Sequence, residues 1–85
     1  MATYYKRIKE LREEQELPQR AVAGLLHVTQ KTYSRYELGQ HEVPITALIQ
    51  MARMYDTSVD YIVELTDQRS PYPLAAEHHN DPTIL

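Results

Sequence analysis

The chain has 85 residues, of which 42% are apolar, and carries nine basic against twelve acidic side chains for a net charge of -3. So short a chain holds one hydrophobic core, which excludes a second domain and argues against a large catalytic cleft. It contains no cysteine, which excludes disulfides, thiolate nucleophiles and cysteine-based zinc sites. No stretch resembles a signal peptide or approaches the ~20 apolar residues of a membrane span, so we expect a cytoplasmic protein without membrane contact.

The excess of acidic residues lies mainly at the carboxyl end. Residues 66–85 contain one basic and three acidic residues, whereas residues 1–65 contain eight basic and nine acidic ones. Within residues 19–41, by contrast, a single acidic residue, Glu37, accompanies three basic ones: Arg20, Lys31 and Arg35. This window is locally cationic, and an anionic partner is therefore expected to bind there.

Two amphipathic helices are predicted in the first third of the chain. The first runs from Thr3, a potential N-cap, to Glu16, and its apolar face carries Tyr5, Ile8 and Leu11. The second begins at Pro18, which a first helical turn tolerates, and repeats apolar residues at Val22, Ala23 and Leu26. Gly24 weakens this second helix by up to ~1 kcal/mol relative to alanine, so we expect packing to hold it.

A third helix is predicted from Thr29 to Leu38. The Thr29 hydroxyl can cap the free amides of the first turn. Val28 before the cap and Tyr33 at the fourth helical position are spaced as a hydrophobic staple, which fixes the angle at which the chain enters the helix. Gly39 is placed to end the helix in a left-handed conformation.

Two further helices complete the predicted fold. The first runs from Pro44, at the first helical position, to about Tyr55, and its expected inward residues are Ile45, Leu48, Ile49, Ala52 and Tyr55. Ser58 caps the last helix, for which we expect an inner stripe of Val59, Ile62 and Leu65. No run alternates with a period of two, so no sheet is expected and the predicted fold class is all-α with five short helices.

The sequence divides into a helical domain over residues 1–67 and a tail over residues 68–85. The tail contains three prolines and a polar segment, AEHHNDP, which interrupt helical continuity. We expect this acidic tail to be a flexible extension or a strap that binds a partner.

The predicted third helix carries a polar arc opposite its packed face. At 100° per residue, four polar side chains span about 140°: Gln30, Lys31, Ser34 and Arg35. A major groove admits one helix, in which glutamine can bridge adenine N6 and N7 while lysine or arginine addresses guanine O6 and N7. The short Ser34 side chain would let such a helix approach the bases. A solvated polar face is the other explanation of the arc.

The segment QRAVAGLLHVTQKTYSRYELG, residues 19–39, resembles the helix-turn-helix of the Cro/C1-type, or XRE, family of phage-repressor-like proteins. Ala23 stands where the family has a small residue at the helix crossing, and Val28 where it has an apolar turn residue. The inward positions are filled by Val22, Leu26, Tyr33 and Tyr36. The flanking segments also look like the family's first, fourth and fifth helices, so the resemblance covers residues 8–67 and implies a compact five-helix, lambda-repressor-like DNA-binding domain.

The resemblance implies a role for individual positions of this sequence. Arg12 and Glu37 match an ion pair that joins the first helix to the end of the recognition helix, and an unpaired Glu37 carboxylate on the packed face would be costly to desolvate. Gln19 and Thr29 match positions that contact phosphate, in keeping with anion binding at helix N-termini. The positions that contact bases in the family are matched by Gln30, Lys31, Ser34 and Arg35.

Three positions depart from the family pattern. Pro18 replaces the usual capping residue of the second helix, so phosphate contact there depends on Gln19 and backbone amides. His27 replaces a glycine that adopts a left-handed conformation, which histidine tolerates with strain. In the loop after the recognition helix only His41 can become cationic, which leaves it as a third phosphate contact. With about 4 phosphates neutralised, a monomer should bind DNA weakly.

We therefore predict a sequence-specific, double-stranded DNA-binding regulator of a bacterium or phage, with repression as its expected mode of action. Two-fold proteins bind pseudo-palindromes, and dimerisation would compensate for weak binding by one subunit. The candidate dimer contacts are Tyr4, Tyr5, Tyr61, Val63 and Leu65, which could equally pack within one chain. The alternative function is a dimeric protein-interaction module, such as an antitoxin, co-regulator or repressor antagonist, which would bind a protein partner through the fifth helix or the tail.

Catalysis and metal binding have little support in the sequence. The only cluster of potential ligands is His78, His79 and Asp81 in the tail, where adjacent histidines point apart and no scaffold fixes their geometry. With two glycines in the chain there is no phosphate-cradling loop. We predict no enzymatic activity, no catalytic residue, no metal and no cofactor.

Overall fold

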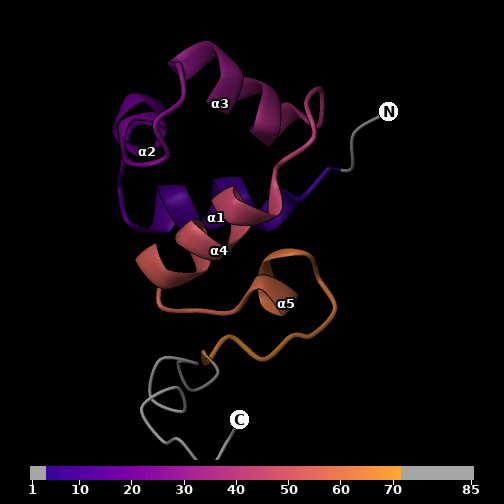
Figure 1. The fold of residues 1–85 in the computed structure, drawn as a ribbon. Helices are drawn as coiled ribbons and strands as arrows, with labels where there is room; N and C mark the ends of the chain where they lie inside the picture. The colour runs from indigo at the N-terminus through magenta and orange to yellow at the C-terminus, as the bar shows by residue number, and fades with distance from the viewer. Residues whose placement is uncertain (1–3, 72–85) are drawn as a thin grey trace, which may run out of the picture.

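The computed structural model describes residues 4–71, which form five α-helices and no strand (Figure 1). The helices are α1 (Lys6–Glu14), α2 (Gln19–Leu25), α3 (Gln30–Leu38), α4 (Ile45–Met54) and α5 (Val59–Ile62). α2 packs on α3 at one end of the molecule and α4 on α5 at the other, while α1 contacts both α3 and α5. The all-α, five-helix prediction is confirmed. Thr3 and residues 72–85 of the tail lie outside the described residues.

One continuous apolar core joins the five helices. Its fully buried side chains include Ile8 of α1, Val22 of α2, Tyr33 of α3 and Met51 of α4. The predicted inner faces of the first three helices are confirmed, because Leu11, Ala23, Leu26 and Tyr36 are also buried. Tyr5 and Val28 are half-buried and pack against this core.

The predicted inner faces of the last two helices need correction. Ile45 and Ile49 are 60% and 40% exposed, and the α4 core positions are instead Leu48, Met51 and Ala52, followed by Tyr55. Ile45 and Ile49 are one helical turn apart and share a side of α4 that lies next to the buried stripe, which runs through Leu48, Met51 and Tyr55. Leu65 is 77% exposed because α5 ends at Ile62 and the chain has left its helical phase before Leu65.

Side chains cap two of the helices as the sequence predicts. The Thr29 hydroxyl accepts a hydrogen bond from the Thr32 N–H at 3.1 Å, and the Ser58 hydroxyl accepts one from the Tyr61 N–H at 3.0 Å. Pro44, expected at the first helical position, is instead the extended residue before α4. A proline there has no N–H to leave unpaired and favours the extended conformation in which it lies.

All five helices end in the same way. After each, one residue adopts a left-handed conformation with φ between 54° and 71°. The following N–H bonds back to a carbonyl five residues earlier, for example from Leu17 to Arg12 at 3.1 Å and from Leu65 to Asp60 at 2.8 Å. This is the Schellman motif, which satisfies carbonyls at a helix end. The left-handed residues are Glu16, His27, Gly39, Asp56 and Glu64. The predicted conformations of His27 and Gly39 are thereby confirmed.

The segment after α5 is held against α1 by polar contacts. The Arg7 guanidinium donates to the carbonyls of Tyr61 and Thr66, at 2.6 and 2.7 Å, and to the Asp67 carboxylate at 2.7 Å. It also lies over the Tyr61 ring, 4.0 Å from the centroid. Arg69 pairs with Glu14 of α1 at 2.7 Å. These contacts fix the chain as far as residue 69 on the side of α1 that faces α5.

The two glycines should respond in opposite directions to substitution by alanine. Gly39→Ala places a side chain at φ +71° and a Cβ atom 3.1 Å from the Tyr4 Cβ, so we expect a loss of about 1–2 kcal/mol in the free energy of unfolding. Gly24→Ala meets no heavy atom within 4 Å and removes a poor helix former, so we expect a gain of up to ~1 kcal/mol. Urea unfolding measures both values, and shifts of the same sign would contradict the roles assigned to the two glycines.

Candidate nucleic-acid interface

Helix α3 presents one face to the core and the opposite face to solvent. Tyr33 and Tyr36 are buried and meet edge to face, with ring centroids 6.3 Å apart. On the other side Gln30, Lys31 and Arg35 are exposed, and Ser34 is half-buried between them. The four residues predicted to contact bases therefore share the solvent side of one helix. None of them has a polar side-chain partner within the described part of the chain.

A buried ion pair fixes the inner face of α3. The Arg12 guanidinium of α1 contacts both oxygens of the Glu37 carboxylate, with Nε–Oε2 at 2.6 Å and Nη2–Oε1 at 3.1 Å. Its Nη1 donates to the Leu17 carbonyl at 2.8 Å, and the Gln19 amide donates to Glu37 Oε1 at 3.0 Å. Such two-pronged, charge-assisted contact is directional. The network thus joins α1, the start of α2 and the end of α3.

This network keeps Glu37 ionised inside the protein. Burial alone would raise the pKa of Glu37, but hydrogen bonds from Arg12 and Gln19, together with the Arg12 charge, outweigh it and lower the pKa. The buried Tyr33 hydroxyl lies near the carboxylate without the geometry of a hydrogen bond. Burial, reinforced by Glu37, raises the pKa of Tyr33, and burial likewise raises the pKa of Tyr55 to about 12. Both phenols therefore stay neutral.

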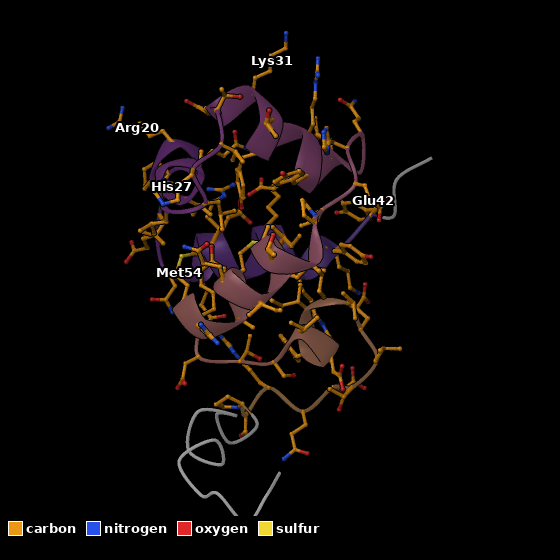
Figure 2. All side chains as sticks on the ribbon, viewed as in Figure 1. Arg20, His27, Lys31, Glu42 and Met54 are labelled. Atoms are coloured by element: carbon orange, nitrogen blue, oxygen red, sulfur yellow. The ribbon has the colours of Figure 1, made fainter. Side chains whose placement is uncertain are left out.

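The basic side chains divide into a paired and an unpaired group. Those on α1 and after α5 that pair with carboxylates are Lys6, Arg7, Arg12 and Arg69. The basic residues of α2 and α3, in contrast, are all exposed and have no carboxylate partner within residues 4–71. Figure 2 shows Arg20 projecting outward from α2 and Lys31 from α3. Apart from the exposed Lys9, the positive charge of α1 and of the segment after α5 is thus paired with carboxylates, whereas that of α2 and α3 is left available.

The side chains predicted to contact phosphate are already engaged within the protein. Thr29 caps α3 and donates to the Thr32 hydroxyl at 3.0 Å. Gln19 uses an amide N–H on Glu37, a contact that the sequence alone did not predict. The Nδ1 atom of the exposed His41 ring lies 2.8 Å from the Glu42 carbonyl oxygen. The same ring meets the Tyr36 ring edge-on, with ring centroids 5.3 Å apart. The structure therefore holds each of these groups in a defined position.

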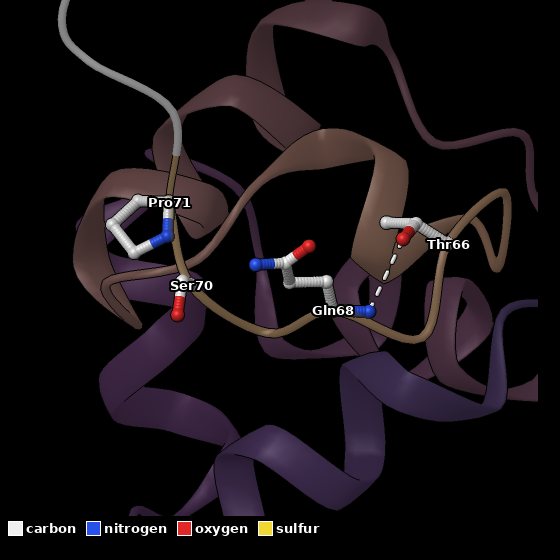
Figure 3. Close-up of a pocket in the computed structure, with 4 residues that line it drawn as sticks. All are labelled: Thr66, Gln68, Ser70 and Pro71. Carbon is white, nitrogen blue, oxygen red and sulfur yellow. Dashed lines mark hydrogen bonds between the residues drawn. The ribbon is translucent and has the colours of Figure 1, made fainter.

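A pocket elsewhere in the described chain has no charged side chain in its lining. Thr66, Gln68, Ser70 and Pro71 line it, and the Gln68 N–H donates to the Thr66 hydroxyl at 3.1 Å (Figure 3). Because none of these side chains is charged, the pocket provides no group for acid–base or metal chemistry. Residues 4–71 contain no group of three histidine or acidic side chains that could hold a metal ion, and no helix among them is long and apolar enough to cross a membrane. His78, His79 and Asp81 lie outside the described residues.

Comparison with known families covers most of the domain. Residues 8–62, from α1 to the end of α5, match the helix-turn-helix family. The chain belongs to the XRE-type helix-turn-helix family.

Individual relatives agree with this membership. The chain is 35% identical over 68 residues to the uncharacterized HTH-type transcriptional regulator YobD of Bacillus subtilis, a match that covers 80% of this chain and 61% of YobD. It is 31% identical over 71 residues to the HTH-type transcriptional regulator AnsR of the same organism, covering 84% of this chain and 61% of AnsR. The chain thus spans 61% of the length of either relative.

A solved structure shares the fold. The crystal structure of a transcriptional regulator from Listeria innocua matches with a TM-score of 0.70 at 24% identity, covering 94% of this chain and 74% of the other. At this identity the likeness concerns the arrangement of the helices alone.

Acid should destabilise this XRE-type domain through Glu37. Because the folded-state pKa of Glu37 is lowered, its ion pair adds stability above the unfolded pKa of about 4.3 and loses it as the pH falls through the folded-state value. We expect Glu37→Gln to cost about 3 kcal/mol at neutral pH, since it leaves the Arg12 charge without its partner. Urea unfolding between about pH 7 and pH 3 should show a smaller loss of stability in the variant than in the wild type. Equal losses would contradict the assignment.

Proposed function

We propose that this chain is a sequence-specific, double-stranded DNA-binding transcriptional regulator that inserts α3 (Gln30–Leu38) into the major groove. The observation that carries the proposal is the division of α3 between a face fixed by the core and the Arg12–Glu37 pair and a face of exposed amide and cationic side chains. A groove about 12 Å wide accepts one helix whose outward side chains meet the base edges. Membership of the XRE-type family supports the same function.

Four side chains of α3 would contact bases. The Gln30 amide can pair with adenine N6 and N7, and the Lys31 and Arg35 cations can donate to guanine O6 and N7. Ser34 lies half-buried between them, and its short side chain leaves room for close approach to the groove floor. We therefore expect each half-site of the operator to contain both adenine and guanine.

Phosphate contacts would flank the base contacts at both ends of α3. Thr29 and Gln19 lie at the starts of α3 and α2, where unpaired amide groups favour an anion. His41 follows the C-terminal end of α3, and because its Nδ1 faces the Glu42 carbonyl, its Nε2 is the ring nitrogen left to face a phosphate. Such contacts hold the position and orientation of the protein on DNA without distinguishing sequences.

The relatives support a regulatory role for this chain. Both YobD and AnsR are HTH-type transcriptional regulators of a bacterium, which supports a bacterial or phage regulator. We propose repression as its mode, since a protein seated on an operator competes with other proteins for the same DNA. We also propose a homodimer. A two-fold protein binds two half-sites about 34 Å apart, which would compensate for the weak binding expected of one subunit.

Two α3 variants test the proposed base contacts. Lys31→Ala and Arg35→Ala should each weaken binding to a duplex selected from a random pool by about 1–3 kcal/mol, because each removes donors to a base edge. Circular dichroism should show unchanged folding, since both side chains are exposed. Arg53→Ala on α4, which removes another exposed cation, serves as the control and should bind like the wild type. A wild-type chain that prefers no duplex would refute the proposed function and favour the protein-interaction alternative.

A second pair of variants tests the dimer. Leu65 is 77% exposed, beside the half-buried Tyr61 and Val63, so Leu65→Glu should leave the fold intact and shift sedimentation equilibrium toward the monomer. Ile45→Glu is the matched control, because Ile45 is 60% exposed on α4 and lies outside the proposed contacts. A wild-type protein that stays monomeric in the presence of a two-half-site duplex would disprove the homodimer.

A further inference from the structure

We infer that Arg20 of α2 is a phosphate-contacting residue that positions the protein on the DNA strand beside the groove occupied by α3. The inference rests on the proposed function and adds a residue that the match to the helix-turn-helix pattern did not assign. It concerns the side chain of Arg20 alone and makes no use of the α2 N-terminus.

The first observation is the freedom of the Arg20 side chain. Arg20 is the second residue of α2 and is exposed. Its guanidinium has no hydrogen-bond or carboxylate partner within the described part of the chain, whereas Arg7 and Arg12 of α1 are held by several contacts each. Its neighbour Gln19, by contrast, is half-buried and bonded to Glu37. Gln19 thus has one amide N–H engaged within the protein, whereas the whole Arg20 guanidinium is available to an external anion.

The second observation is the position of α2 beside α3. The two helices pack directly against each other, and packed helices have axes about 8–10 Å apart. Half the width of a major groove is about 6 Å, so a helix at that distance from α3 lies over the strand that borders the groove. Arg20 projects outward from this helix in Figure 2, as Lys31 does from α3. A flanking cation in this place meets phosphate oxygens rather than base edges.

The third observation is the charge beyond the other end of α3. The loop between α3 and α4 carries Glu42, whose side chain is exposed, and offers only His41 as a potential cation. Figure 2 shows Glu42 well separated from Arg20. Because a carboxylate repels phosphate, the loop contributes little attraction to the backbone. Of the two segments that flank α3, α2 therefore offers the stronger attraction to phosphate, through Arg20.

Loss of a single phosphate contact has an effect of defined size. Neutralising one phosphate changes the slope of log K against log salt by about 0.9, which corresponds to roughly eightfold in affinity at about 0.1 M salt. A phosphate contact does not depend on the base sequence, so the loss of affinity should be the same for a specific and a non-specific duplex. A base contact would instead weaken the specific complex more.

The experiment compares Arg20→Ala with the wild type over a series of salt concentrations. The probes are the duplex that the wild type selects from a random pool and a scrambled duplex of the same composition. Arg20→Ala should lose about eightfold on both and show a slope shallower by about 0.9, while Arg20→Lys keeps most of the affinity. Arg53→Ala is the matched control for loss of one positive charge elsewhere, and thermal melting checks that each variant is folded.

The outcomes separate this inference from the function on which it rests. If Arg20→Ala binds both duplexes like the wild type while Lys31→Ala is weakened, the inference is wrong and the proposed function stands. If Arg20→Ala loses affinity only for the selected duplex, Arg20 contacts bases and the inference is again wrong. An equal loss in Arg53→Ala would show a general charge effect and also overturn it. A wild-type chain without preference for any duplex would overturn the function itself.

Discussion

The bidentate contact between Arg12 and Glu37 determines where the exposed face of α3 points. Glu37 lies in the last turn of α3 and is almost completely buried, so its charge requires a partner inside the protein. Arg12 supplies that partner and also binds the Leu17 carbonyl, at the junction between α1 and α2. With Tyr33 and Tyr36 packed in the core, α3 has no rotation about its axis that would keep these contacts and turn its polar side inward.

The distribution of charge complements this arrangement. The chain as a whole is acidic, and several of its basic side chains are bound to carboxylates on α1 or after α5. Those of α2 and α3 are not. A net charge of -3 is therefore compatible with a polyanionic partner, because a polyanion that approaches the α2–α3 surface would meet the local field of its unpaired cations.

Local chemistry made most of the fold predictable from the sequence. The Thr29 and Ser58 caps and the left-handed turn at Gly39 follow from the conformational preferences of single residues, and the left-handed turn at His27 was implied by the resemblance to the family. The exposure of Ile45 and Leu65 did not follow, because it depends on where a helix ends and which neighbour covers its first turn. The Gln19–Glu37 hydrogen bond was not predicted either, since it joins residues on two helices and, unlike the Arg12–Glu37 pair, was not implied by the resemblance. Which of the α3 side chains touch bases was inferred from resemblance and stays a prediction.

The five Schellman ends have a consequence for how firmly the domain holds together. Glycine occupies the left-handed position after α3 only; the other four helices place a glutamate, a histidine or an aspartate there. A side chain in that conformation costs roughly 1 kcal/mol, so the four together withhold a sizeable share of the roughly 5–15 kcal/mol typical of a small domain. Glycine in place of Glu16, His27, Asp56 or Glu64 would remove this cost and make the domain more resistant to heat.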